Sequence, residues 1–169
     1  MHGLCTWLAA GLTTGENQLM PAQRLHPTEL MQLYLTDIAQ GGKLELIEQI
    51  AHADMVDEAN QVFGGPPGRT GLVQHVAGFR KYIQDAEVDI RKIVAGDNDV
   101  MAWWRFCGTH AGPWLGRAPT GKRITGDVFS FFELQQGLVS RYSLWLHAGF
   151  DEPVIFDSAA CLKSGCRPT

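Results

Sequence analysis

The stretch from Gly108 to Gly126, GTHAGPWLGRAPTGKRITG, gathers the residue types that proteins use for anion binding and acid–base chemistry. A phosphate-binding loop needs backbone amides at the start of a helix and the spacing G-x-x-x-x-G-K-[ST]. That spacing is missing here, and a strand-like run follows the glycines. The stretch therefore predicts a long hairpin with no nucleotide site. We expect His110 to be hydrogen-bonded near its rim, because no second ligand stands at metal-binding spacing.

The remaining cysteines and histidines predict no metal site and no disulfide framework. None of the four cysteines forms a C-x-x-C pair: Cys5, Cys107, Cys161 and Cys166. This pattern indicates reduced thiols and a cytoplasmic protein. His52 and His75 are predicted to be structural, like His110. A net charge of −4 argues against nucleic acid as a partner, since phosphate binding needs a basic face.

The length of 169 residues predicts one domain, which we place at residues 25–150. Residues 1–24 are expected to be a poorly ordered extension, with a signal peptide or an apolar patch covering a partner as alternatives. The apolar run at residues 4–12 is too short to span a membrane, and no other segment predicts a span. Residues 151–169 form a tail, whose apolar cluster at 154–156 is expected to pack on the domain or on a neighbouring subunit.

The periodicity of apolar residues changes halfway along this domain. Helical spacing predicts helices from residue 28 to the glycines at 41–42, over 44–50 and over 70–83. Residues 51–63 break the period, and the glycine- and proline-rich segment that follows is a loop. An alternating segment begins at residue 86, and three segments rich in aromatic and β-branched residues follow from residues 99, 124 and 138, with tight turns at 96–99 and 135–137. Helices followed by an antiparallel meander predict an α+β fold.

The hairpin residues resemble the signature G-T-H-x-G-x-x-x-G-x-x-P-T-G-K of the SnoaL-like polyketide cyclase and ester cyclase family. The resemblance extends into both flanking strands and covers residues 28–150. It implies the cone-shaped α+β barrel of the nuclear transport factor two-like superfamily. In that fold a strongly curved, mostly antiparallel sheet and three N-terminal helices enclose an apolar cavity.

The resemblance also implies where the family's chemistry would lie. Its polyketide cyclases use an aspartate and a histidine on the last two strands as an acid–base pair, without metal or cofactor. Counted from Pro119 and Thr120, the histidine's place holds Ser130 and the aspartate's place holds Leu144. Neither residue can perform the same proton transfer. The fold therefore carries over, whereas the family's own acid–base pair does not.

Strand parity and the resemblance together predict the residues of the cavity. The expected substrate-binding residues are Tyr34, Trp104, Phe106, Val128, Ser130, Phe132 and Leu144. The expected catalytic groups are Asp57, Tyr142 and His147. Relatives place a polar substrate-contacting residue near Asp57, and a carboxylate beside aromatic rings suits general-base work, although a helix cap is the alternative. His147 stands where ester cyclases carry an aspartate, with a rim or interface histidine as the alternative.

These residues predict a cofactor-free isomerase, cyclase or hydrolase that acts on a small hydrophobic molecule, polycyclic or terpenoid-like. The alternative is a non-catalytic module for binding a hydrophobic ligand or for dimerisation. Aromatic residues fall on both faces of the strands, so we expect a homodimer through the outer sheet face. Arg105 is expected to pair with Asp127 or Glu133, or with the partner subunit. The hairpin itself is expected to lie outside the site.

Overall fold

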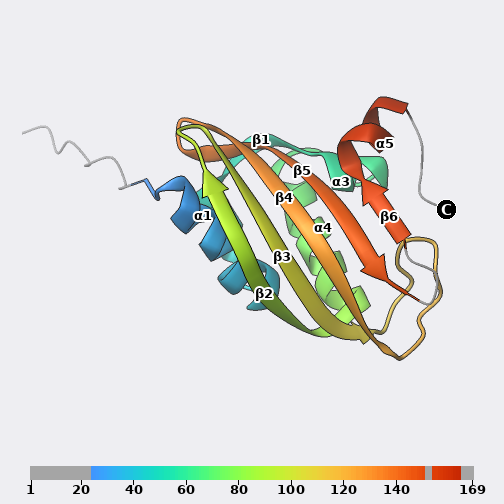
Figure 1. Cartoon of the computed structure of the whole chain (residues 1–169). Coiled ribbons are helices and arrows are strands. Elements are labelled where there is room, and N and C mark those ends of the chain that lie inside the picture. The colour runs from blue at the N-terminus through green and yellow to red at the C-terminus, as the bar shows by residue number, and fades with distance from the viewer. Residues whose placement is uncertain (1–23, 151–153, 165–169) are drawn as a thin grey trace, which may run out of the picture.

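The structure, a computed structural model, describes residues 24–150 and 154–164 (Figure 1). In this part the chain forms one six-stranded sheet. Five of its strands follow the order β1-β5-β4-β3-β2, and β6 pairs with β5 outside this order. Strand β2 pairs with β3, β3 with β4 and β4 with β5, all antiparallel, whereas β1 pairs with β5 in parallel. The strands are β1 (Ala51–Asp57), β2 (Ile83–Ala95), β3 (Asp99–His110), β4 (Arg123–Gln135), β5 (Leu138–Gly149) and β6 (Val154–Asp157).

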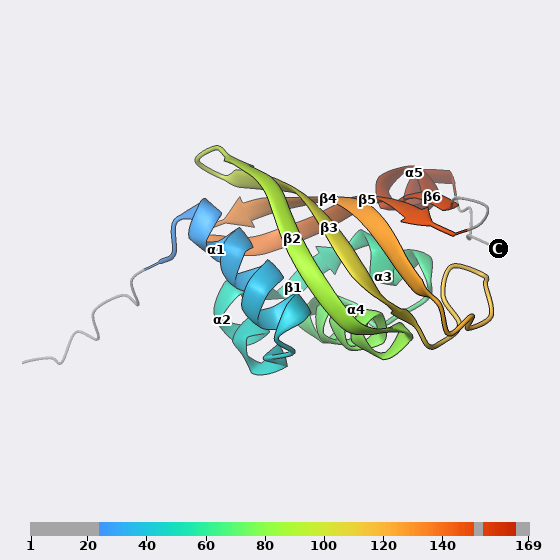
Figure 2. The same cartoon turned by 60° about the horizontal axis from the view of Figure 1, so that its bottom comes forward.

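Helices from the first half of the chain cover the concave face of this sheet (Figure 2). The first helix begins with a capping box between His26 and Glu29 and buries a stripe that includes Leu30 and Tyr34. It ends before Gly42, whose φ of 78° favours glycine. The helices are α1 (Pro27–Leu33), the π-helix η1 (Tyr34–Gln40), the 3-10 turn η2 (Leu44–Leu46), α2 (Ile47–Ile50), α3 (Glu58–Val62), α4 (Gly68–Tyr82) and α5 (Ser158–Ser164).

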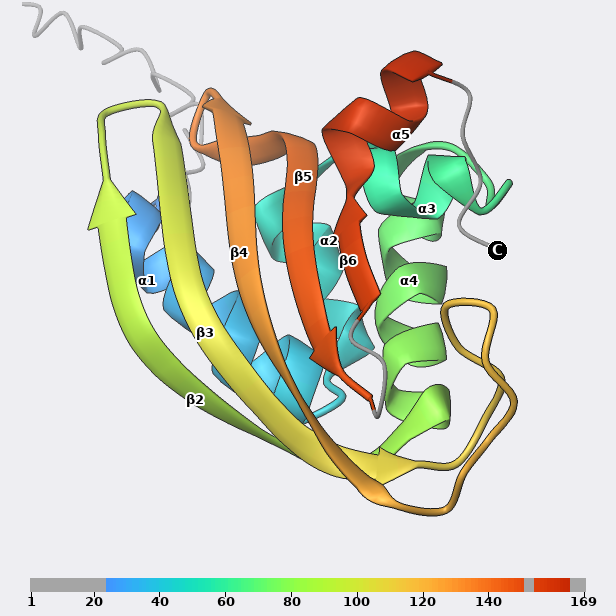
Figure 3. The same cartoon turned by 45° about the vertical axis from the view of Figure 1, so that its right-hand side comes forward.

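Strands β3 and β4 alternate between a buried and an exposed face. On β4, Val128, Ser130 and Phe132 are buried towards the helices, whereas Phe129 is 40% exposed on the outer face. The sheet bends strongly along its strands, as Figure 3 shows, and its edges do not close. The predicted α+β cone and its strand parity are confirmed, with an open sheet in place of a complete barrel.

Four elements, β1, α3, β6 and α5, lie outside the predicted set of helices and strands. The stretch at residues 51–62 contains β1 and α3, because β1 gains its partners from a parallel pairing with β5 that involves Val56↔Arg141 and Asp57↔Tyr142. This long-range pairing leaves no periodic trace in the sequence. Residues 154–157 pair with β5 of the same chain, and α5 follows them onto α3.

Residues 1–23, 151–153 and 165–169 are not described, so the predicted extension and the end of the tail fall outside the structure. The same holds for Cys5 and Cys166. Within the described residues, no helix has the length and apolar character needed to cross a membrane.

Candidate functional site

A cavity of about 800 Å³ lies between the concave face of the sheet and the helices. Its wall is mainly apolar and aromatic, and α4 contributes residues over two turns, from Gln74 to Tyr82. The sheet, the first helical segment and β6 supply Tyr34, Trp104, Phe106, Val128, Tyr142, Leu144, Leu146 and Phe156. A cavity of this size, largely apolar and with few polar groups, is typical of a small-molecule site.

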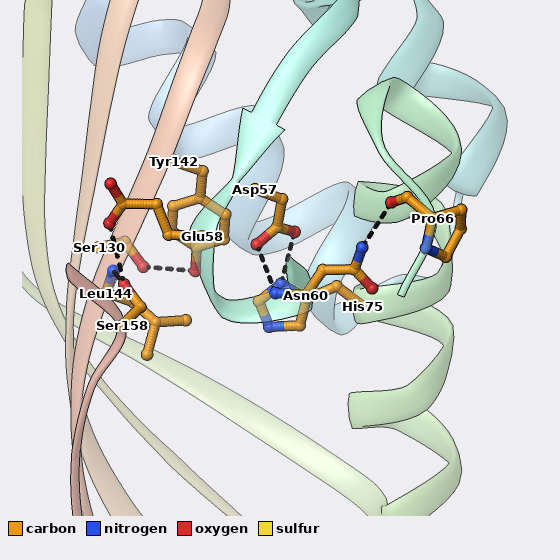
Figure 4. A network of polar contacts seen from close by, with 9 residues as sticks. All are labelled: Asp57, Glu58, Asn60, Pro66, His75, Ser130, Tyr142, Leu144 and Ser158. Atoms are coloured by element: carbon orange, nitrogen blue, oxygen red, sulfur yellow. Dashed lines mark hydrogen bonds and ion pairs between the residues drawn. The ribbon is translucent and has the colours of Figure 1, made fainter. Parts of the chain in front are cut away.

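The polar centre of the cavity wall is a pair formed by Asp57 and His75 (Figure 4). The Nδ1 atom of His75 lies 2.7 Å from Oδ2 of Asp57. The Asp57 side chain is 1% exposed, and the His75 side chain is 23% exposed and lines the cavity. Because a carboxylate can only accept, Nδ1 carries the hydrogen, and the Nε2 atom of neutral His75 is left with its lone pair.

Local backbone structure places these two side chains opposite each other. Asp57 ends β1 and caps α3, where its Oδ1 accepts a hydrogen bond of 3.0 Å from the backbone N–H of Asn60. Gly68 begins α4 with a φ of 69°, and a Cβ there would lie 2.3 Å from the carbonyl oxygen of Ala53. Glycine therefore lets α4 pack closely on β1, which brings His75 onto Asp57.

Burial and the neighbouring carboxylate act in opposite directions on His75. Burial lowers the pKa of His75, while the charge and the hydrogen bond of Asp57 raise it. The Asp57 contributions prevail, so the pKa of His75 lies above its ordinary value. The pair thus holds an imidazole that is oriented, partly shielded from water and more basic than usual.

Tyr142 belongs to a second polar chain, and its ring stacks on the His75 imidazole with the ring centroids 5.6 Å apart. The indole Nε1 of Trp104 donates to Ser130 Oγ at 3.0 Å, and Ser130 Oγ lies 3.0 Å from the Tyr142 hydroxyl. Since an indole can only donate, the Ser130 hydroxyl is free to donate onward to Tyr142, whose own hydrogen then points to a further acceptor. Burial raises the pKa of Tyr142, so its phenol stays protonated.

The neighbouring carboxylate, Glu58, is used for structure. It lies 3.0 Å from the guanidinium of Arg141, and Ser158 Oγ donates to it at 3.4 Å. Ser158 also accepts the backbone N–H of Leu144 at 2.9 Å. The contacts of Ser158 with Glu58 and Leu144, drawn in Figure 4, fasten α5 to α3 and β5.

Most of the predicted cavity residues lie where parity places them. Tyr34, Trp104, Phe106, Val128 and Leu144 line the cavity with Tyr142. Ser130 and Phe132 are fully buried directly behind this wall. Asp57 caps α3, the alternative to a catalytic role, and its second oxygen contacts His75. It does not itself line the cavity.

The prediction for His147 is wrong in its placement. His147 is exposed on the outer face of β5, opposite Asp127, because its position alternates with those of Leu146 and Ala148, which are buried. Asp127 forms two hydrogen bonds with Arg105, of 3.1 and 2.7 Å, as predicted for that arginine. The structure therefore brings Asp57 and Tyr142 together and leaves His147 on the other side of the sheet.

The sequence predicts a structural role for His75 and a place outside the site for the hairpin, and both predictions are wrong in placement. His75 lines the cavity, and its only sequence signal is a polar residue on the cavity-facing stripe of α4. Residues 113–118 of the hairpin also line the cavity. His110 is fully buried at the base of this loop, with Nδ1 3.2 Å from Thr120 Oγ1. The described residues contain no group of three or more His, Cys, Asp or Glu placed to hold a metal.

Comparison with known proteins identifies the fold independently. The family model for SnoaL-like polyketide cyclase matches residues 29–145. TsrD from Streptomyces laurentii has a similar structure with a TM-score of 0.61 and 18% identity, over 70% of this chain and 86% of that one. A SnoaL-like polyketide cyclase from Agrobacterium tumefaciens gives a TM-score of 0.61 at 15% identity, over 74% of this chain and 92% of that one. No curated protein sequence matches the chain.

Proposed function

Because the chain belongs to the SnoaL-like polyketide cyclase family, we propose that it is an enzyme that moves a proton next to a carbonyl group of a small hydrophobic molecule. The observation that carries this proposal is the Asp57–His75 pair, joined at 2.7 Å, with His75 on the wall of an apolar cavity. The family's usual positions hold Ser130 and Leu144, so the acid–base group has moved to β1 and α4. Neither a cofactor nor a metal is needed for this chemistry.

The chemistry has two proton transfers. The Nε2 atom of His75 takes a proton from the carbon beside the carbonyl, and the electron pair of that C–H bond forms the C=C bond of an enolate. Asp57 stabilises the imidazolium and keeps its orientation. The enolate carbon then closes a ring on a second carbonyl of the same molecule, and His75 returns its proton to the new alkoxide. Return of the proton to another carbon would give an isomer instead.

Tyr142 stabilises the negative charge that develops on the carbonyl oxygen. Its protonated phenol is hydrogen-bonded to Ser130, which accepts from Trp104, and it also forms a hydrogen bond with Tyr34. Each donor polarises the next, so the Tyr142 O–H is a stronger donor than an isolated phenol. Such a preoriented donor in an apolar cavity supplies the kind of stabilisation found in oxyanion holes.

A heavy-water exchange experiment tests this assignment with a simple apolar ketone such as 2-tetralone. We expect the protein to accelerate deuterium uptake at the carbon beside the carbonyl, followed by NMR. H75Q should abolish the acceleration, and Y142F should reduce it while the ketone still binds. Exchange that continues at the full rate in H75Q would refute the role of His75.

A non-catalytic ligand carrier is the second candidate, favoured by the apolar wall of Val128, Leu144 and Leu146. The same experiment separates the two functions. A carrier would bind the ketone, detected by NMR line broadening, without any exchange above the rate in buffer.

The outer face of the sheet supports the further proposal of a homodimer. Met101, Trp103 and Phe129 are each about 40% exposed there, and the rings of Trp103 and Phe129 stack at 5.9 Å. Burial of such a patch by a second copy would remove a large aromatic surface from water. The reduced thiol of Cys107 supports a reducing compartment, the cytoplasm.

A further inference from the structure

Tyr34 is a second phenol on the cavity wall, and the two proton transfers do not use it. It begins the π-helix η1, and its side chain is buried. Its ring packs edge-on against Phe132 and Tyr142, with ring centroids 5.0 and 5.7 Å apart. A π-helical segment is rare and occurs often at functional sites. Tyr34 thus lies beside Tyr142, the proposed donor to the substrate.

A hydrogen bond joins the side chains of Tyr34 and Tyr142. Burial is the largest effect on both phenols and raises both pKa values. The hydrogen bond between them acts in opposite directions, because it raises the pKa of Tyr34 and lowers that of Tyr142. A hydrogen bond stabilises the neutral form of its donor and the anion of its acceptor. Tyr34 is therefore the donor and Tyr142 the acceptor.

The oxygen of Tyr142 accepts a second hydrogen bond, from Ser130. Ser130 Oγ lies 3.0 Å from the Tyr142 hydroxyl and itself accepts from the indole N–H of Trp104. Against the larger effect of burial, this bond also lowers the pKa of Tyr142, as donation by Ser130 requires. With its oxygen engaged twice, Tyr142 has its own hydrogen left to offer. This hydrogen lies near the base, because the Tyr142 ring stacks on His75 at 5.6 Å.

From this arrangement we infer that Tyr34 is a positioning residue for Tyr142. By donating to the Tyr142 oxygen, it makes Tyr142 a pure donor towards the cavity, so the site favours a ligand oxygen that only accepts and gains negative charge. An enolate or phenolate oxygen meets this requirement, whereas a neutral phenol finds no acceptor on Tyr142 for its hydrogen. The two accepted bonds also polarise the Tyr142 O–H. This inference rests on the proposed function of the cavity and adds how the site selects the charged form of its ligand.

Pentafluorophenol tests the inference, because its phenolate oxygen resembles that of an enolate and its fluorine NMR shifts distinguish the anion from the neutral form. The titration uses the H75Q background, so that no imidazole ionises beside the ligand. We expect the pKa of the bound pentafluorophenol to be about one pH unit higher in H75Q/Y34F than in H75Q. The preference for the anion is then roughly tenfold weaker, because Tyr142 loses one donor and regains a lone pair that accepts from the neutral form.

Matched variants in the same background separate this role from a general loss of polarity. Y82F removes a phenol from the same cavity wall outside the chain and should leave the pKa of the bound pentafluorophenol unchanged. S130A removes the other donor to Tyr142 and should raise it, which tests the same oxygen from a different element. Y142F removes the contact itself and should raise it more than Y34F. The inference is overturned by an unchanged pKa in Y34F or S130A, by an equal rise in Y82F, or by a rise in Y34F as large as that in Y142F.

The cavity and the base are tested by separate measurements. Pentafluorobenzene has the same ring without the hydroxyl group and should bind the wild type and Y34F equally. If it fails to bind the wild type, the proposed cavity site itself fails. Y34F should slow the deuterium exchange of 2-tetralone about tenfold with unchanged ketone binding. Exchange that persists in H75Q refutes the proposed base, whereas the titration in H75Q depends on the phenols and still decides the role of Tyr34.

Discussion

Replacement of Asp57 by asparagine isolates what the carboxylate does for His75. The two oxygens of Asp57 serve two donors, the Asn60 backbone N–H at 3.0 Å and His75 Nδ1 at 2.7 Å. The asparagine in D57N has a single oxygen of similar shape. If that oxygen keeps the cap of α3, its NH₂ group faces His75, whose Nδ1 must then accept. His75 is thereby forced into the tautomer with hydrogen on Nε2, the wrong form for a base.

The pKa of His75 should change in a predictable direction. In the wild type the charge and hydrogen bond of Asp57 outweigh burial and hold the pKa above 6.5. In D57N only burial remains as a large effect, so the pKa of His75 should fall below 6.5. Titration of the His75 ring followed by NMR measures this pKa, and nitrogen shifts identify the tautomer.

Stability should respond to pH with opposite signs in the two proteins. In the wild type the folded pKa exceeds the unfolded one, so the stabilisation by the pair is complete below pH 6.5 and is lost as the pH rises through the folded pKa. In D57N the folded pKa is the lower one, so the protein should lose stability as the pH falls below 6.5. The double variant D57N/H75Q should lose this pH dependence, since the titrating group is gone.

The loss of unfolding free energy distinguishes the role of Asp57 as the cap of α3 from its role as the partner of His75. D57N keeps the cap and should cost less than about 1 kcal/mol of unfolding free energy at pH 8, because both side chains still find partners. D57A removes the cap and leaves a donor without an acceptor, so it should cost about 2–4 kcal/mol. Urea titration measures both values. A His75 that keeps its pKa and its tautomer in D57N would refute the reasoning.

Three further outcomes follow from the packing. S130A should cost about 1–3 kcal/mol, because a buried indole N–H loses its acceptor, whereas S140A on the exposed side should cost under about 0.5 kcal/mol; urea titration compares them. G126A should destabilise by about 1–3 kcal/mol, since its Cβ would lie 2.2 Å from a phenylalanine ring carbon on the cavity wall. G78A meets only ordinary contacts and should stabilise α4 by up to about 1 kcal/mol, a contrast that thermal melting can show. F129R should produce a monomer in sedimentation without weakening the binding of a neutral cavity probe; a dimer that persists would exclude the outer face as the interface.

Local sequence signals account for most of the framework. The period of the first helix and the alternation of four strands can be read from residues a few positions apart, because each element must bury one face. This parity correctly placed Val128, Leu144 and Tyr142 on the inner face. Applied consistently, the same parity puts His147 on the outer face with Trp145, so its cavity role rested on the family comparison alone.

The tertiary structure decided which polar groups meet. Asp57 and His75 are 18 positions apart, on a short parallel strand and on a helix, and no periodic pattern links them. Their contact depends on a close approach of α4 to β1 that glycine permits at position 68. The hairpin tip, residues 113–118, likewise lines the cavity through an arrangement that no local pattern predicts. The family, the four long antiparallel strands and the apolar wall could be predicted from the sequence, because they follow from local periodicity and a contiguous motif. The Asp57–His75 contact, the parallel strand β1 and the position of the hairpin tip required the tertiary structure, because they arise from contacts between segments with no local signal for each other.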